Sequence, residues 1–241
     1  MQRQTTPVIK QIEDLVADIP GWSPIDQLFA LFNLVYNSAG LEGDVIELGS
    51  WCGRSSAVLA LAALHTQRTT VHCIDLFPEK DDWYRNSDGT YSLSVTIEGR
   101  TFTAYQEQTV WGEPFAKDIE PLYAKHNGVY EVFRDALTRN GLDSVVTAHR
   151  GTLATFSDTA PSTLKCRVAF VDGDHSYRAV CEDIERIERF LVPGGWISFD
   201  DAFSHYDGVN RAITDRIINS PTYELCQQMT RKLFVARRKT S

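Results

Sequence analysis

The sequence lacks the features that mark secreted, zinc-binding and membrane-spanning proteins. Its five cysteines are odd in number and scattered, with no Cys-x-x-Cys pair, so we expect neither a disulfide framework nor a zinc site. No run approaches the roughly 18 apolar residues of a membrane span, and residues 1–10 are polar, without an apolar signal segment. We therefore expect a cytoplasmic protein with reduced thiols and no membrane partner.

Positive charge is also scarce. The net charge is −8 and the isoelectric point is about 5.2, so the phosphates of a nucleic acid would be repelled overall. The one dense basic cluster lies near the end of the chain, and we interpret it as solvated strand edges and tail rather than a binding patch. Its members are Arg231, Lys232, Arg237, Arg238 and Lys239.

The bulk composition is that of an ordinary folded domain. At 241 residues and 43% hydrophobic content, the chain is long enough to bury a full core. We expect a single domain over 1–241. Residues 1–40 should form N-terminal helices, because apolar residues recur at helical spacing before Pro20 and again between Pro24 and Asn37.

A glycine-rich turn follows the first predicted strand. The strand Val45–Leu48 runs into Gly49 and Gly53, and a helix-forming segment then begins at Ser55. In such a strand–turn–helix unit the N–H groups of the helix face a ligand, and glycine permits the sharp turn. The spacing Gly-x-x-x-Gly departs from the Gly-x-Gly-x-x-Gly of dinucleotide-binding proteins, which argues against a nicotinamide-dependent oxidoreductase.

The remaining strands alternate with helices, which is typical of an α/β domain with a mostly parallel sheet. The last two strands are close enough in sequence to pair as an antiparallel hairpin. The second strand ends at Asp75, a residue placed to accept hydrogen bonds from a ribose or, alternatively, to cap the next turn. We predict strands at 69–76, 144–150, 167–171, 196–199, 223–228 and 233–237.

Residues 77–131 interrupt this alternation. The window 77–133 contains 11 of the 26 aromatic residues, so we expect it to pack against another part of the protein or another subunit rather than to form a loose linker. Residues 91–105 alternate apolar and polar side chains around Glu98-Gly99, which predicts a β-hairpin. We interpret 77–131 as an inserted lid over the ligand-binding edge or, alternatively, as an oligomer contact.

Acidic residues follow the ends of two central strands. Because parallel strands end at one edge, we expect Glu47, Asp75, Asp172, Asp200 and Asp201 to converge there, with the last three at neighbouring strand ends. Three such carboxylates repel one another unless protons or a cation neutralise them, and their oxygens suit Mg²⁺. The alternative is that they only cap strand and helix ends.

A histidine lies next to these acids. His175 follows Asp172 by three residues and is our first candidate for the base that accepts a hydroxyl proton. Asp174 is a second candidate, or a residue that orients the histidine, and His205 is a third. A structural turn histidine is the alternative for His175.

Five motifs together resemble the class I S-adenosylmethionine-dependent methyltransferases. The resemblance is strongest to the metal-dependent O-methyltransferases, which include catechol and macrocin-type sugar enzymes. It implies a three-layer Rossmann-like fold with a mostly parallel seven-stranded sheet and an antiparallel last strand. The motifs are Glu-Leu-Gly-Ser-Trp-Cys-Gly-Arg-Ser-Ser (47–56), Ile-Asp-Leu (74–76), Phe-Val-Asp-Gly-Asp-His-Ser-Tyr (170–177), Leu-Val-Pro-Gly-Gly (191–195) and Phe-Asp-Asp (199–201).

The resemblance also implies roles for individual residues. The divalent metal, Mg²⁺ first, would be held by Asp172, Asp200 and Asp201. His175 stands where catechol-type enzymes carry a lysine and sugar-directed relatives a histidine. The residues implied to bind S-adenosylmethionine are Glu47, Gly49, Ser50, Gly53, Ser55, Asp75, Leu76, Gly151, Thr152 and Asp172.

The function implied is metal-assisted methylation of a hydroxyl on a small molecule. The histidine favours a sugar or natural-product acceptor, such as a polyketide or glycoside, over a catechol or phenol. A non-catalytic protein that binds S-adenosylmethionine is a rival of another class, as is the oxidoreductase. We also expect a homo-oligomer, a dimer or higher.

Overall fold

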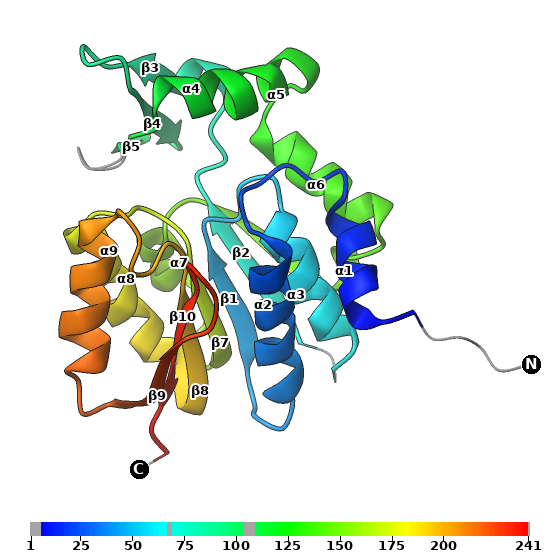
Figure 1. Cartoon of the computed structure of the whole chain (residues 1–241), viewed down its shortest axis with the longest axis vertical. Helices are drawn as coiled ribbons and strands as arrows, with labels where there is room; N and C mark the ends of the chain where they lie inside the picture. The colour runs from blue at the N-terminus through cyan, green and yellow to red at the C-terminus, as the bar shows by residue number, and fades with distance from the viewer. Residues whose placement is uncertain (1–5, 67–68, 104–108, 241) are drawn as a thin grey trace, which may run out of the picture.

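The computed structural model describes residues 6–66, 69–103 and 109–240. Within them a central sheet carries helices on both faces, and a smaller sheet with its own helices stands over one edge (Figure 1). No helix in this described part is long and apolar enough to cross a bilayer.

The central sheet has seven strands in the order β6-β2-β1-β7-β8-β10-β9. The first five are mutually parallel, whereas β10 runs antiparallel to both β8 and β9. This confirms the predicted mostly parallel sheet with an antiparallel last strand. The strands are β1 (Asp44–Leu48), β2 (Val71–Asp75), β6 (Val146–Arg150), β7 (Cys166–Val171), β8 (Leu191–Phe199), β9 (Tyr223–Gln228) and β10 (Phe234–Arg238).

Alternation along the strands divides the core into two halves. In β1, Val45 contributes to one buried cluster while Ile46 and Leu48 contribute to the other, because successive side chains point to opposite faces. The first cluster lies under α1 (Val8–Val16), α2 (Ile25–Asn37), α3 (Arg54–Leu64) and α6 (Val129–Arg139). The second lies under α7 (Leu153–Thr159), α8 (Tyr177–Phe190) and α9 (Asp207–Ile213).

One strand is longer than the sequence pattern predicted. We expected the fifth strand to begin at Trp196, with Pro193-Gly194-Gly195 as a stop, but β8 begins at Leu191. Gly194 has a φ of +81°, a backbone conformation that glycine adopts readily, so the strand continues through it. The pairing of β8 with β7 shifts register in this region.

The interrupting segment forms a separate small sheet in the order β3-β4-β5. The predicted hairpin is present as β4 (Tyr91–Ile97) and β5 (Arg100–Thr103), and Glu98 and Gly99 both have the positive φ of a tight hairpin turn. The end of that prediction, 104–105, lies outside the described residues. The third strand, β3 (Trp83–Arg85), was not predicted.

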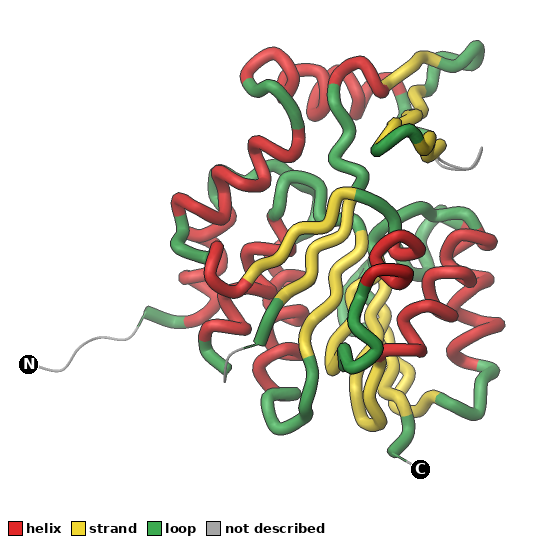
Figure 2. The backbone as a smooth tube through the Cα atoms, turned by 180° about the vertical axis from the view of Figure 1, so that it is seen from behind, coloured by secondary structure: helices red, strands yellow, loops and turns green. Residues whose placement is uncertain are grey.

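Short helices complete the inserted segment and connect it to the core. They are α4 (Gly112–Pro114), η2 (Phe115–Ile119) and α5 (Glu120–Lys125). Figures 1 and 2 show this group raised above the end of the central sheet and joined to it by the stretch after β2 and by α6. The 3-10 turns η1 (Lys80–Asp82) and η3 (Asp143–Val145), and the π-helix η4 (Thr214–Ile218) that continues α9, complete the described helical elements.

Candidate active site

A cavity of about 990 Å³ lies between the carboxyl edge of the central sheet and the inserted segment. Its size matches the upper range of ligand sites, enough for a cofactor with a second molecule. Most of the residues predicted to act in the site line it, although Glu47 and Gly53 do not. Those that do are Gly49, Ser50, Ser55, Asp75, Leu76, Gly151, Thr152, Asp172, Asp174, His175, Asp200, Asp201 and His205.

Gly49 is fixed by the strand ends on both sides. Its N–H donates to the carbonyl of Ile74 at 2.9 Å, and its φ is +88°. A Cβ at this position would lie 1.8 Å from the carbonyl oxygen of Asp172. Glycine is therefore required here by the backbone of the neighbouring strand, in addition to any close approach of a ligand.

Glu47 lies beneath the glycine turn, fully buried. One carboxylate oxygen accepts hydrogen bonds from the hydroxyls of Ser50 and Ser56, so the side chain ties the turn to the first turn of α3. Burial raises the pKa of this carboxyl, and the serine hydroxyls act against that rise. Gly53 precedes α3 and packs against Phe133, which explains its absence from the cavity wall.

Asp75 holds two strained turns at the cavity edge. Its carboxylate accepts the N–H of Trp51 at 2.9 Å and that of Phe77 at 2.5 Å. Both residues have a φ of +46°, a left-handed conformation that costs on the order of 1–3 kcal/mol and is concentrated at functional sites. The alternative reading of Asp75 as a turn cap is thus realised, and its lone pairs still leave capacity for a ribose.

Arg54 ties the N-terminal helices to this site. Its guanidinium donates to the carbonyls of Val16, Ile19 and Ser23, at 2.6, 2.9 and 3.0 Å. The segment between α1 and α2, including Trp22, thereby forms one wall of the cavity beside the glycine turn.

Asp172, Asp200 and Asp201 converge at the ends of β7 and β8, as the strand pattern predicted. Burial raises the pKa of Asp172 well above its usual range, and the adjacent Asp200 carboxylate raises it further. The Asp200 N–H donates to the carbonyl of Val171, the residue before Asp172, at 3.0 Å, which brings these two chain-distant residues together at the strand ends.

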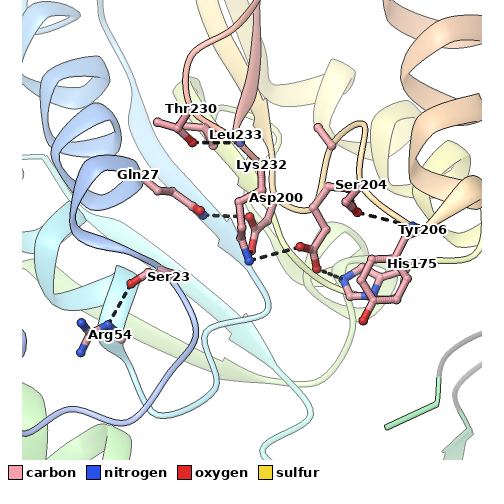
Figure 3. Close-up of polar contacts among 12 residues, drawn as sticks. Ser23, Gln27, Arg54, His175, Asp200, Ser204, Tyr206, Thr230, Lys232 and Leu233 are labelled. Atoms are coloured by element: carbon pink, nitrogen blue, oxygen red, sulfur yellow. Dashed lines mark hydrogen bonds and ion pairs between the residues drawn. The ribbon is translucent and has the colours of Figure 1, made fainter. Parts of the chain in front are cut away.

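A cation that was not predicted from the sequence lies among these acids. The Lys232 ammonium is 3.0 Å from Asp200 Oδ2 and 3.2 Å from Asp201 Oδ1 (Figure 3). Burial lowers the pKa of Lys232, but the three neighbouring carboxylates outweigh it and raise the pKa above its usual value. The interpretation of Lys232 as part of a solvated tail was therefore wrong, since only 15% of its side chain is exposed.

Strand register could have revealed Lys232. Because β10 is antiparallel to β8 with Phe234 opposite Phe199, residue 232 lies level with the loop that follows β8. The sequence predicted both strands but did not set their register.

The carboxylates do not fit a divalent ion in this arrangement. No group of three His, Cys, Asp or Glu side chains that could hold a metal occurs in residues 6–66, 69–103 and 109–240. The oxygens of Asp200 and Asp201 face side-chain nitrogens instead, from Lys232 and from two further residues described below. The expected Mg²⁺ site stays a prediction from the sequence.

His175 lies beside the acids, with its Nε2 3.5 Å from Asp201 Oδ2. Its ring packs against Tyr206 at a centroid distance of 4.1 Å, and Tyr206 packs equally close to His205. Burial lowers the pKa of His175, although the carboxylates of Asp201, Asp200 and Asp174 act to raise it. Burial thus favours the neutral imidazole, which is the form that can accept a proton.

The other base candidates are placed differently. Asp174 accepts the N–H of Ser176 at 2.8 Å, which shapes the turn that leads into α8. His205 is exposed at the cavity rim. Of the three candidates, His175 combines burial with a place beside the carboxylates.

Asp183 on α8 also lines the cavity, although the sequence pattern did not predict it there. Burial, with Asp174 and Glu182 nearby, raises the pKa of Asp183 to about 7, against the opposing effect of Arg186. A raised folded-state pKa means that the folded protein holds this proton more tightly. The contribution of Asp183 to the unfolding free energy is therefore fully present below its unfolded-state pKa of 3.8. That contribution is lost as the pH rises through the folded-state pKa of about 7.

Asp183→Asn should remove the fall in unfolding free energy that the native protein shows as the pH rises, because asparagine does not ionise. We expect the variant to exceed the native protein in unfolding free energy by about 2 kcal/mol at pH 8, and by less at pH 5. Urea unfolding at the two pH values measures it. An equal gain at both would contradict the assignment, because an uncharged effect would not depend on pH.

Residues 46–202 match the model of a family described as a methyltransferase domain. A search of curated protein sequences found no match.

Several solved structures share the fold across nearly the whole chain. The O-methyltransferase NovP is 19% identical, with 99% of this chain and 90% of that chain covered and a TM-score of 0.61. The O-methyltransferase TomG from Streptomyces achromogenes, in complex with SAM, is 13% identical over 98% and 91%, with a TM-score of 0.57. An O-methyltransferase from Bacillus cereus in complex with SAH is 14% identical over 98% and 93%, also with a TM-score of 0.57.

Proposed function

The chain belongs to the methyltransferase-domain family, and from this we propose that it transfers the methyl group of S-adenosylmethionine to a hydroxyl of a small molecule. The observation that carries the proposal is the single cavity joining the glycine turn to His175 and the acids. Structural neighbours described as O-methyltransferases, one in complex with SAM and another with SAH, support it.

The cofactor would lie along the strand ends. The methionine carboxylate would meet Ser55 at the N-terminus of α3, where helix N–H groups favour an anion. Asp75 would bind the ribose, while Gly151 and Thr152 would border the adenine. Glu47 would act from below, through Ser50, since it does not reach the cavity.

The acceptor would occupy the part of the cavity under the inserted segment. Four of the five tryptophans line it, and Trp51 packs against Trp22 and Trp83 at centroid distances of 5.9 and 6.3 Å. The fourth, Trp111, is 67% exposed. Broad aromatic faces suit a flat or ring-shaped neutral molecule, so we propose a sugar or natural-product acceptor, with a catechol or phenol as the alternative.

The inserted segment would serve as the cover of the acceptor site. It contributes Leu93, Phe102 and Trp111 to the wall. Trp22 Nε1 also donates to Asp118 of this segment at 3.2 Å, which links the cover to the N-terminal helices. The alternative role of the inserted segment is an oligomer contact. That role and the homo-oligomer itself remain predictions. The cytoplasmic location also remains a prediction.

His175 would take the hydroxyl proton. The acceptor oxygen then forms a bond to the methyl carbon while the carbon–sulfur bond breaks and sulfur keeps the electron pair. Holding the two reactants in line supplies much of the rate gain in such a displacement. Magnesium assistance is not part of this proposal, since Asp200 and Asp201 do not fit the ion as they stand.

Labelled S-adenosylmethionine provides the test. The protein should bind it in calorimetry, Asp75→Asn should weaken that binding by about tenfold to a hundredfold, and label should pass to members of a panel of glycosides, polyketides and catechols. Binding of NAD(H) instead would favour the oxidoreductase. Binding of S-adenosylmethionine with no transfer to any acceptor would favour the non-catalytic rival.

A further inference from the structure

The two aspartates after β8 are held by a lysine from the last hairpin. Lys232 lies in the turn between β9 and β10, and its ammonium forms ion pairs with both Asp200 and Asp201 (Figure 3). The side chain of Asp200 is 4% exposed and that of Lys232 is 15% exposed, so these charges are largely shielded from solvent. A buried pair of this kind interacts far more strongly than a surface pair.

The remaining oxygens of the two aspartates also face nitrogen. Asp200 Oδ1 accepts a hydrogen bond of 2.9 Å from Nε2 of Gln27, a fully buried residue of α2. Asp201 Oδ2 faces Nε2 of His175 from the loop before α8. Three separate parts of the chain thus supply nitrogens to the four carboxylate oxygens, and a metal ion would have to displace them.

The backbone around Lys232 is fixed to the loop that it neutralises. The Lys232 carbonyl accepts the N–H of Ala202, the residue after Asp201, at 2.9 Å. Within the turn, Met229 N–H donates to the Leu233 carbonyl at 2.8 Å, and Leu233 N–H donates to Thr230 Oγ1 at 3.2 Å. The ammonium is therefore a built part of the site rather than the end of a solvated tail.

We propose that the Lys232 ammonium is the resident cation of this site and stands in the position predicted for a divalent metal. It lines the same cavity as His175, and an ammonium has three N–H donors, of which two are directed at the aspartates. Its further role, which rests on the proposed function, is to donate to the acceptor oxygen while His175 takes the proton. Lys232 itself neither gains nor loses a proton in the step.

Manganese binding tests the proposal without an acceptor. Mn²⁺ titrations followed by electron paramagnetic resonance should show no stoichiometric site in the native protein. Lys232→Met removes the competing charge, and we expect Mn²⁺ affinity to rise by about tenfold or more. Asp200→Asn in that background should remove the gain.

Lys165→Met is the matched control. It removes the same charge as Lys232→Met, but Lys165 pairs with Glu42 on the exposed surface. It should leave Mn²⁺ binding unchanged. One Mn²⁺ bound to the native protein and lost in Asp200→Asn would overturn the proposal. So would an absence of binding in Lys232→Met, since the aspartates would then not be a cation site.

Calorimetry with S-adenosylmethionine separates this result from the proposed function. A native protein that fails to bind S-adenosylmethionine contradicts the methyltransferase proposal, whatever Mn²⁺ does. A protein that binds S-adenosylmethionine, and whose methyl transfer is unchanged by EDTA, supports Lys232 as the cation. Transfer abolished by EDTA and restored by Mg²⁺ would refute it.

Discussion

Gly49→Ala is expected to abolish S-adenosylmethionine binding and to lower the unfolding free energy by about 3 kcal/mol or more. The added Cβ would lie 1.8 Å from the carbonyl oxygen of Asp172 and 2.5 Å from its carbonyl carbon. Both are backbone atoms, and the Asp172 N–H is itself bonded to the Leu48 carbonyl at 2.9 Å, so neither strand end can yield without losing that bond. Calorimetry and urea unfolding measure the two effects.

Gly141→Ala is the matched control for the backbone conformation. Gly141 has a φ of +66° but nothing within 4 Å of an added Cβ, so its substitution costs only the conformational strain, about 1 kcal/mol. Equal losses in the two variants would show that the approach to Asp172 is not what requires glycine. S-adenosylmethionine affinity should be unchanged in Gly141→Ala, which lies outside the cavity wall.

His175→Gln is expected to lower kcat by about 10²–10⁴-fold, the usual contribution of a general base, while the affinity for S-adenosylmethionine stays near the native value. Glutamine keeps a polar side chain of similar length beside Asp201 and Tyr206 but cannot accept the proton. Single-turnover rates with an acceptor found in the labelled panel provide the measurement, and the cofactor affinity is measured in parallel.

His205→Gln is the control within the same cavity. His205 is also in contact with Tyr206 but is exposed, so its variant should retain most of the native rate. A larger loss of rate in His205→Gln than in His175→Gln would identify His205, at the cavity rim, as the base. If Asp174→Asn lowered kcat by about 10²–10⁴-fold and neither histidine variant did, the proton transfer would be assigned to the Asp174 carboxylate.

Strand periodicity predicted most of what brings the site together. The acids after β7 and β8 converge because parallel strands end at one edge, and that follows from the order of strands and helices. The Glu98-Gly99 turn was predictable for a different, local reason, since the residues of a tight turn set the hairpin.

The parts that escaped prediction depend on contacts between distant segments. Gln27 reaches Asp200 only because α2 packs over the strand edge, and Lys232 reaches it only because β10 pairs with β8 in one register. Neither residue carries a local signal, and a lysine in a basic stretch is ordinarily solvated. Glu47 was placed in the right motif, but its depth below the turn is a matter of side-chain packing.

The guanidinium of Arg54 has a consequence for how small this enzyme can be made. Its three carbonyl partners are Val16 at the end of α1 and Ile19 and Ser23 in the segment between α1 and α2, so this N-terminal region is anchored beside the glycine turn. A shortened chain that starts at the first strand would keep its seven-stranded scaffold and yet present an open-sided groove. The complete cavity wall therefore includes residues 20–23, which precede the family match at residues 46–202.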